Sequence, residues 1–273
     1  MQDPADTATS TAAGAKGPFR LAVIIPALNE ERSLPLVLTA LAGIELGTDR
    51  HGRQIRIAEV VVVDNGSTDG TARVASHHGA TVLSEKKRGY GRACLKGLAH
   101  LTSTPPDIVV FLDADFSDDP SCLAALVAPI SAGEMDLVLG SRLLGRCEPG
   151  ALLPQARYGN RLAVTLIRLL YGFTYTDLGP FRAIGFSALE RLGMRDETFG
   201  WTAEMQVKAL RCGLRVAEIP VAYRKRVGTS KITGTFSGTV KAGAMILWTI
   251  ARYRFWNPRG APQRRTSRDR GPS

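Results

Sequence analysis

Through its first 140 residues, the chain alternates between short apolar runs and longer amphipathic segments. The apolar runs at residues 21–25, 60–63 and 108–112 are rich in β-branched side chains and have the length of buried strands. After the first run, apolar residues recur at i, i+3, i+4 and i+7 from Leu34 to Leu41, which is the spacing of a helix packed on one side. Strands and helices that alternate in this way predict an α/β fold with a mostly parallel central sheet and helices on both faces.

Two later segments combine apolar and basic side chains. A helix is expected from about residue 155 to 171, and residues 242–251 form a run of ten uncharged, mostly apolar residues. Spanning a bilayer takes about 20 apolar residues, so the second segment either lies in a membrane interface or closes the core. The basic side chains are Arg157, Arg161 and Arg168 in the first segment and Lys241, Arg252 and Arg254 beside the second. The pair predicts amphipathic helices that contact a membrane surface.

The net charge of +10 is concentrated at the C-terminus. Residues 252–273 hold seven arginines and one aspartate, an excess of six, so about +4 remains for the rest of the chain. This distribution argues against a nucleic-acid partner and favours an anionic membrane surface or a merely solubilising tail. Residues 1–17 and 257–273 lack apolar runs and are expected to be disordered, which leaves one domain at 18–256. The four cysteines show no metal-ligand spacing and are interpreted as reduced thiols of a cytoplasmic protein.

Carboxylates close two of the apolar runs. The run 108–112 is followed by Asp113 and Asp115, and the run 60–63 by Asp64. Because ligands of open α/β sheets bind outside the carboxyl ends of the strands, these side chains are expected at one ligand-binding edge. Two hard oxygen donors at such an edge suit a Mg²⁺ or Mn²⁺ ion that also holds substrate phosphates. An isolated Asp-x-Asp is also common in a plain polar turn, and the second carboxylate-tipped strand favours the metal site.

Several motifs together resemble those of the family 2 glycosyltransferases, which have the GT-A fold. The three motifs at the predicted strand ends are Pro26-Ala27-Leu28-Asn29-Glu30, Val63-Asp64-Asn65-Gly66-Ser67-Thr68-Asp69-Gly70-Thr71 and Asp113-Ala114-Asp115. Later segments are similar to the branch that glycosylates polyprenyl phosphates, namely Gly140-Ser141-Arg142, Asp177-Leu178-Gly179-Pro180-Phe181-Arg182 and Arg226-Val227-Gly228-Thr229-Ser230-Lys231. The chain departs from that branch at Gly179-Pro180, where Ser-Gly is more usual, and at Phe116-Ser117, where some relatives carry a Gln that joins the metal. The resemblance covers about residues 18–232.

The resemblance implies roles for the residues at the nucleotide end. The backbone around Pro26 would line the base, Glu30 would face the ribose, and Asp64 would accept a hydrogen bond from the base. Asp113 would lie near the ribose and the metal, and Asp115 would bind the Mg²⁺ or Mn²⁺ ion. Arg88 and Gly89 are expected near the diphosphate.

The acceptor decides the rest of the chemistry. A sugar hydroxyl needs a general base, for which the resemblance offers Glu204. A phosphate monoester has a second pKa of about 6, so it needs positioning more than deprotonation. The residues expected to position such a phosphate are Arg142, Arg182, Arg224, Arg226, Ser230 and Lys231, with Arg182 also a catalytic candidate. An ion pair between Arg182 and Asp177 is the structural alternative.

These observations predict an inverting, metal-dependent hexosyltransferase. Its donor would be a UDP- or GDP-linked hexose, and its acceptor a polyprenyl phosphate at the cytoplasmic face of the cell membrane, where the protein would be peripheral. Transfer to a soluble or glycan hydroxyl, with Glu204 as base, is the alternative within the family. A nucleotidyltransferase is disfavoured because the first strand lacks a Gly-rich triphosphate loop. A sugar-nucleotide-binding membrane adaptor without turnover is the alternative outside enzymes, and the metal-ready pair of aspartates argues against it.

Overall fold

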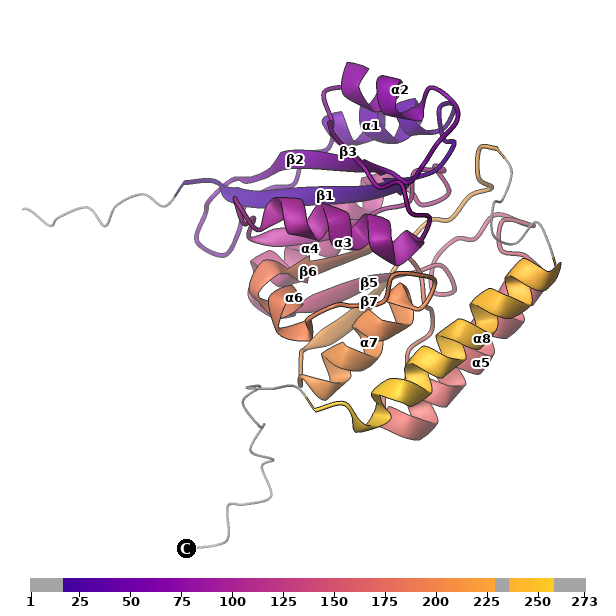
Figure 1. The fold of residues 1–273 in the computed structure, drawn as a ribbon. Helices are drawn as coiled ribbons and strands as arrows, with labels where there is room; N and C mark the ends of the chain where they lie inside the picture. Colours follow the sequence, from indigo (N-terminus) through magenta and orange to yellow (C-terminus); the bar gives the residue numbers. More distant parts are fainter. Residues whose placement is uncertain (1–16, 229–235, 258–273) are drawn as a thin grey trace, which may run out of the picture.

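A computed structural model of the chain describes residues 17–228 and 236–257. The two terminal segments expected to be disordered lie outside these residues except for Gly17 and Asn257. Ser230 and Lys231, two of the expected acceptor-binding residues, lie outside them as well. Figure 1 shows a central sheet with helices packed on it and a pair of long helices along one end.

Seven strands of the described chain form one sheet, in the order β3-β2-β1-β4-β6-β5-β7. β6 is antiparallel to its neighbours β4 and β5, while the other strand pairs are parallel. The predicted mostly parallel sheet is therefore confirmed. The strands are β1 (Phe19–Ala27), β2 (Ile55–Asp64), β3 (Thr81–Ser84), β4 (Ile108–Phe111), β5 (Leu137–Ser141), β6 (Arg182–Gly185) and β7 (Val216–Pro220).

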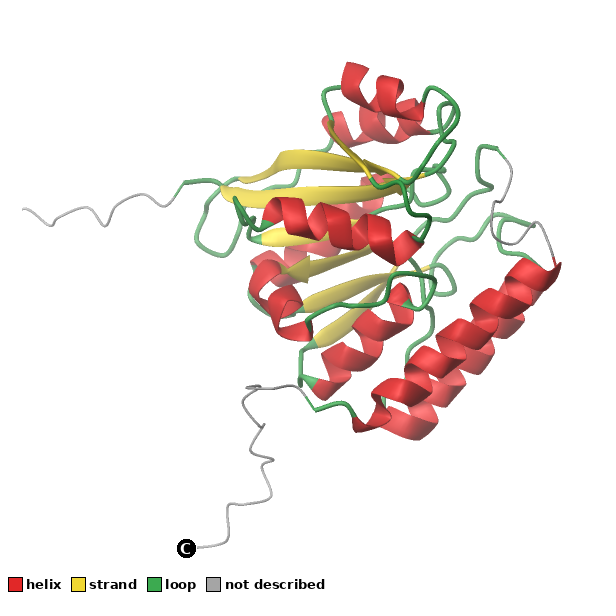
Figure 2. Cartoon of the chain, in the orientation of Figure 1, coloured by secondary structure: helices red, strands yellow, loops and turns green. Residues whose placement is uncertain are grey.

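Helices cover both faces of this sheet (Figure 2). The helices are α1 (Leu34–Ala42), α2 (Thr71–His77), α3 (Tyr90–Leu101), η1 (Pro120–Cys122), α4 (Leu123–Ser131), α5 (Pro154–Tyr171), α6 (Phe186–Leu192), α7 (Trp201–Arg211), α8 (Phe236–Arg252) and η2 (Tyr253–Phe255). None of the described helices is both long enough and apolar enough to cross a bilayer.

The apolar runs are buried on both sides because the two faces of the sheet belong to two cores. Side chains alternate between the faces of a strand, so Leu21, Val23 and Ile25 of β1 join the core that includes α1 and α4. Ala22 and Ile24 join the opposite core, to which α3, α5 and α7 contribute. This double coverage explains why the strands of the sequence are continuous apolar runs rather than alternating ones.

α5 and α8 lie side by side at the end of the sheet where β7 lies (Figure 1). The Tyr171 hydroxyl, at the end of α5, donates a hydrogen bond of 2.6 Å to the carbonyl of Ile250, near the end of α8. The inner side of this pair belongs to the core, because Ile167 and Ile250 are fully buried. The outer side exposes large apolar residues such as Trp248. Residues 242–251 therefore help to close the core, and their contact with a membrane stays a prediction.

Candidate functional site

A cleft of about 420 Å³ opens at the carboxyl ends of β1, β2 and β4. This is the edge at which open α/β sheets bind ligands, and its volume is in the range of small-molecule sites. Seven of the predicted site residues line it, namely Pro26, Glu30, Arg88, Gly89, Asp113, Asp115 and Arg226. The fold thus brings together residues spread over 200 positions of the chain.

A second hollow, of about 850 Å³, is larger but lies elsewhere. It runs beside the first half of β2, between α1 and the turn before β3. Its acidic residues are Glu45 and Glu59. Glu59 already accepts a hydrogen bond from Thr81 and contacts the His100 ring. The pair of aspartates and the loop-rich wall therefore assign the functional site to the smaller cleft.

Two asparagines tie the loops of the cleft together. The Asn29 side-chain oxygen accepts a hydrogen bond of 2.7 Å from the Thr68 amide, which joins the loop after β1 to the loop after β2. The Asn65 amide group donates to the carbonyls of Glu85 and Lys87, and its oxygen accepts from the Gly89 amide at 2.8 Å. Asn65 thereby holds the loop that presents Arg88 and Gly89.

Asp64 lies at the end of β2, beside the cleft and partly exposed. Its Oδ1 accepts a hydrogen bond of 3.0 Å from the Ser67 amide. Asn65, the next residue, is the one from this strand end that lines the cleft. The expected contact of Asp64 with a nucleotide base stays a prediction.

Asp113 and Asp115 are two of the three carboxylates that line the cleft, and Glu30 is the third. Burial of Asp113, together with the neighbouring charge of Asp115, raises the pKa of Asp113 to about 7, although Arg226 acts in the opposite direction. Asp115 is 5% exposed and sits at a tight turn, because Phe116 adopts a left-handed conformation with φ of 59°. Its Oδ1 accepts hydrogen bonds from the Ser117 amide and hydroxyl at 2.9 and 2.5 Å. Ser117 therefore holds the carboxylate in place.

The wall opposite the aspartates is the loop that precedes α7. The Gly91 and Arg92 amides donate to the carbonyls of Thr198 and Glu197, so the start of α3 is bonded directly to this loop. A side chain at Gly89 or Gly91 would collide with the backbone of Glu197 or Asp196. The glycines thus permit the close approach that places Phe199 in the cleft wall.

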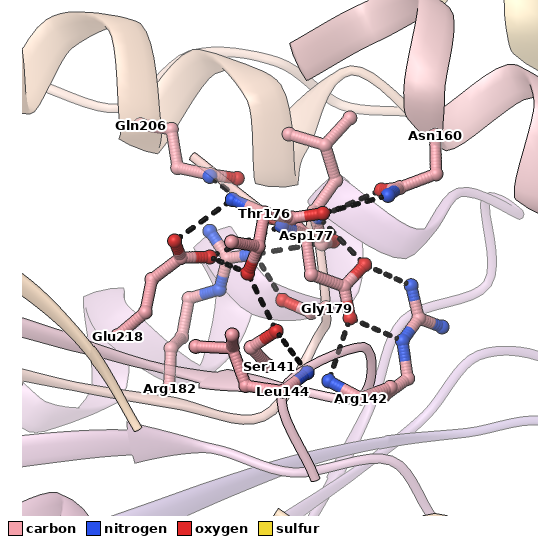
Figure 3. A network of polar contacts seen from close by, with 11 residues as sticks. Ser141, Arg142, Leu144, Asn160, Thr176, Asp177, Gly179, Arg182, Gln206 and Glu218 are labelled. Atoms are coloured by element: carbon pink, nitrogen blue, oxygen red, sulfur yellow. Dashed lines mark hydrogen bonds and ion pairs between the residues drawn. The ribbon is translucent and has the colours of Figure 1, made fainter. Parts of the chain in front are cut away.

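The segment around Asp177 forms a buried polar network rather than an open phosphate site (Figure 3). Asp177 accepts two hydrogen bonds from the Arg142 guanidinium, each 2.7 Å long, and a third from the Arg142 amide. Glu218 accepts hydrogen bonds from Thr176 and from the Asp177 amide. Burial by itself would lower the pKa of Arg142. The hydrogen bonds and the charge of Asp177 raise this pKa by more, so the net shift is upward. Arg142 is therefore committed to Asp177.

The same network corrects the expectations for Arg182. Its side chain is fully buried and donates hydrogen bonds to the carbonyls of Thr202 and Gly179. The alternative ion pair with Asp177 is not formed, because Arg142 takes both carboxylate oxygens (Figure 3). Arg182 has no path to a substrate phosphate in this arrangement, and its role is to join β6 to the start of α7.

Arg224 and Arg226 point in different directions although they are two residues apart. The Arg224 guanidinium pairs with Asp119 at 2.6 Å and lies 4.5 Å from the centre of the Phe116 ring. The Arg226 guanidinium pairs with Asp115 at 3.1 Å and lines the cleft. Of these two arginines, Arg226 is the one placed to meet a substrate in the cleft.

Glu204 is also placed differently from its expected role. It is fully buried in α7, where its carboxylate pairs with Lys208 at 2.6 Å. It also accepts hydrogen bonds from the amides of Arg195 and Asp196 and from the Tyr253 hydroxyl. A general base must reach the proton of its substrate, and both oxygens of Glu204 are already engaged inside the protein. The expectation of a catalytic base is replaced by that of a buried anchor.

The geometry described so far can be compared with known proteins. The sequence profile described as Glycosyl transferase family 2 matches residues 22–193, more than half of the chain. The chain belongs to this family. A Mycobacterium tuberculosis protein described as an uncharacterized glycosyltransferase is 39% identical over 223 residues, covering 81% of this chain and 93% of that protein. The undecaprenyl-phosphate mannosyltransferase of Micrococcus luteus is 30% identical over 235 residues, covering 81% and 90%.

The fold is also shared with solved structures. Glucosyl-3-phosphoglycerate synthase from Mycobacterium tuberculosis superposes with a TM-score of 0.66 and 24% identity, covering 88% of this chain and 81% of that one. Its crystal contains Mn²⁺, UDP and glucosyl-3-phosphoglycerate, and another crystal of the same synthase contains Mg²⁺ and UDP. At this level of identity the likeness establishes the fold, and it confirms the predicted GT-A architecture.

The carboxylates of this family 2 chain fit a hard divalent ion that is shared with a substrate. Within the described residues, no group of three or more His, Cys, Asp or Glu side chains forms a complete protein cage for a metal. Mg²⁺ usually keeps one or two protein carboxylates and completes its shell with substrate phosphates and water. Asp113 and Asp115 offer that partial set, and a dication would relieve the repulsion that raises the pKa of Asp113.

Three cleft residues escape the sequence reasoning. Asn65 belongs to a quoted motif, but its part in holding the Arg88 loop depends on partners 20 and 22 residues away. Tyr90 and Phe199 line the cleft and carry no local signal beyond a neighbouring glycine. The available hint was Gly200, which stands between the aromatic residues Phe199 and Trp201, because a glycine beside aromatics marks a close backbone approach.

Proposed function

We propose that this family 2 glycosyltransferase moves a hexose, with inversion, from a UDP- or GDP-linked donor to a polyprenyl phosphate. The protein would work in the cytoplasm as a peripheral protein of the inner membrane face. The observation that carries the proposal is the outer face of α5 and α8, on which large apolar side chains and arginines are exposed. α8 begins ten residues after the cleft residue Arg226. The similarity to an undecaprenyl-phosphate mannosyltransferase supports it independently.

The donor end of the cleft would work through its own polar groups. The loop from Pro26 to Glu30 and the strand end at Asp64 would hold the nucleoside, while Arg88 and Gly89 would adjoin the diphosphate. Asp113 and Asp115 would hold Mg²⁺ or Mn²⁺, which when bound neutralises the charge that develops on the leaving diphosphate. The residues of the cleft thus position the donor so that one face of the sugar is open to attack.

The acceptor end favours a phosphate over a hydroxyl. A phosphate monoester is already largely ionised near neutral pH, so it attacks without a base. Glu204 has no exposed surface and does not line the cleft, which removes the base that transfer to a hydroxyl was expected to use. Arg226 supplies a cation in the cleft wall for the acceptor or the diphosphate.

A lipid acceptor requires that the protein reach a bilayer, and the α5–α8 face has the composition for it. We define this face by its exposed apolar residues, which are Tyr158, Leu162, Leu169, Trp248 and Phe255. Exposed arginines stand among them at positions 157, 161, 168 and 252. Large apolar side chains ringed by arginines suit insertion into the interface of an anionic membrane.

The first test of the proposal is the product formed. The purified protein with Mn²⁺ and a panel of UDP- and GDP-linked hexoses is expected to yield a glycosylated lipid from undecaprenyl phosphate, identified by mass spectrometry. Phosphoglyceric acid is the matched soluble acceptor, because the structural neighbour was crystallised with it. Transfer to phosphoglyceric acid, with none to the lipid, would refute the lipid proposal and favour a soluble phosphate-bearing acceptor. Nucleotide binding without any transfer would favour the adaptor alternative.

The second test is membrane binding. The protein is expected to sediment with phosphatidylglycerol vesicles at low ionic strength, and less so at high salt, because surface charge is screened. Replacing Leu169 and Trp248 by Ser, at 76% and 67% exposure, should weaken binding at least about tenfold, since each removes apolar area from the bilayer contact. Leu36→Ser, an exposed leucine on α1, is the control and should bind as the wild type does. Failure of the wild type to sediment at low salt would contradict the peripheral location.

A further inference from the structure

Asp115 has two carboxylate oxygens, and each has a partner of its own. Oδ1 accepts hydrogen bonds from the amide and hydroxyl of Ser117. Oδ2 pairs with the Nη1 atom of Arg226 at 3.1 Å. Oδ2 is the oxygen that Ser117 leaves available, so a metal ion held by Asp115 would compete there with the Arg226 guanidinium.

The backbone keeps Arg226 next to Asp115. The Val227 amide donates to the Asp115 carbonyl at 3.0 Å, and the Arg224 amide donates to the Ser117 carbonyl at 2.9 Å. These bonds run along the segment that includes the bridge between Asp118 and Tyr223. Because the main chain is held, Arg226 can leave Asp115 only by a change of its side-chain rotamers.

The guanidinium has room for such a change. The Arg226 side chain is 36% exposed, whereas the Asp115 side chain is 7% exposed. Its free side faces the cleft that Gly89, Tyr90 and Phe199 also line. The guanidinium also interacts with the Tyr223 side chain. A long flexible cation with one side held by Asp115 and Tyr223 and the other side open is able to exchange one anionic partner for another.

We propose that Arg226 is an exchangeable counter-ion of Asp115, which gives up this carboxylate to the divalent metal ion and then binds the phosphate groups of the substrate. The proposal rests on the metal site and the phosphate-bearing substrates assigned to the cleft above. In the first state, Arg226 compensates the charge of Asp115, which is one of the two carboxylates of the site. In the second state, Asp113 and Asp115 would hold the dication, and Arg226 would be free to bind the diphosphate or the acceptor phosphate.

The proposal makes Arg226 a competitor of the metal and a ligand of the nucleotide. Removing Arg226 should therefore change the affinities for metal and for nucleotide in opposite directions. Removing the competitor strengthens the binding of the metal alone. Removing the ligand weakens the binding of the nucleotide diphosphate in the presence of metal. A residue that only stabilised the fold would not move the two affinities in opposite directions.

The test measures Mn²⁺ and nucleotide affinities of the full chain, without any turnover. Arg226→Gln is expected to bind Mn²⁺ alone at least about fivefold tighter than the wild type, by paramagnetic resonance at low salt, because a cation beside the ligand oxygen is removed. With saturating Mn²⁺, the same variant should bind UDP or GDP about tenfold more weakly, since one charged hydrogen bond is lost. Lys225→Gln is the matched control, because Lys225 pairs with Glu148 at 3.6 Å and its side chain is 61% exposed.

Each result decides a part of the proposal. Mn²⁺ affinity that is unchanged or lower in Arg226→Gln would overturn the competition, and unchanged nucleotide affinity would overturn the exchange. Equal effects in Lys225→Gln would reduce both to general electrostatics and likewise overturn it. These outcomes are independent of the acceptor assay, so a failed counter-ion role and a failed lipid-phosphate function are told apart.

Discussion

Asp115→Asn is expected to lower the rate of glycosyl transfer by about a hundredfold or more while the protein stays folded. The variant keeps an oxygen for the bond from Ser117 but loses the charge that holds the metal beside the leaving diphosphate. Loss of one electrostatic stabiliser of a transition state commonly costs a factor of about 10² to 10³. Initial rates at saturating donor and acceptor, with thermal unfolding measured in parallel, check this expectation.

Metal removal should reproduce the effect in the wild type. Chelation with EDTA is expected to stop turnover, and added Mn²⁺ or Mg²⁺ to restore it. Asp119→Asn is the matched control for Asp115→Asn. Asp119 lies four positions after Asp115, pairs with Arg224 and caps η1. The Asp119→Asn variant should retain most of the activity. A metal-free wild type that turns over at its usual rate would contradict the assignment of Asp113 and Asp115 to the metal.

Glu204→Gln is expected to lower the stability of the protein strongly. The substitution leaves Lys208, with 1% side-chain exposure, buried without its 2.6 Å carboxylate partner. Breaking one side of a buried ion pair costs about 3–5 kcal/mol. In domains of roughly 150–250 residues each kcal/mol lowers the melting temperature by about 2–4 °C, so a fall of roughly 10 °C is expected in a thermal scan.

Two comparisons separate the anchoring role of Glu204 from a catalytic one. Glu197, in the loop that precedes α7, is an exposed ion-pair partner of Arg92. Glu197→Gln should change the melting temperature little, because exposed ion pairs contribute about 0–1 kcal/mol. Replacing both Glu204 and Lys208 by Met should recover part of the lost stability, since no buried charge then remains unpaired. If Glu204→Gln melts like the wild type but has lost its turnover, Glu204 acts in catalysis and the anchoring role is wrong.

The sequence predicts well which residues gather at the carboxyl edge of the sheet, because the signal there is local. An apolar run that ends in Asp113 or Asp64 encodes both the strand and its ligand-facing end within about ten residues. Parallel strands bring their carboxyl ends to one edge of the sheet, so the cleft follows once the strands are recognised. β6 and β7 escape this reasoning, because neither contains an apolar run that ends in a carboxylate.

The family motifs, the strand-end carboxylates and the placing of the cleft were therefore determined by the sequence itself. Which basic residues face a substrate was decided only by the tertiary structure. Arg142, Arg182 and Arg226 look alike as candidates, yet the first is bound to Asp177, the second to backbone carbonyls, and the third to Asp115 in the cleft. The partners Asp177, Thr202 and Asp115 lie 20 to more than 100 positions away along the chain, whereas Gly179 is near the arginine that it binds. Neither charge nor spacing along the chain reveals which partner a buried guanidinium will find. Burial and pairing depend on atoms that only the fold brings together, and these decide whether a charge serves the substrate or the protein.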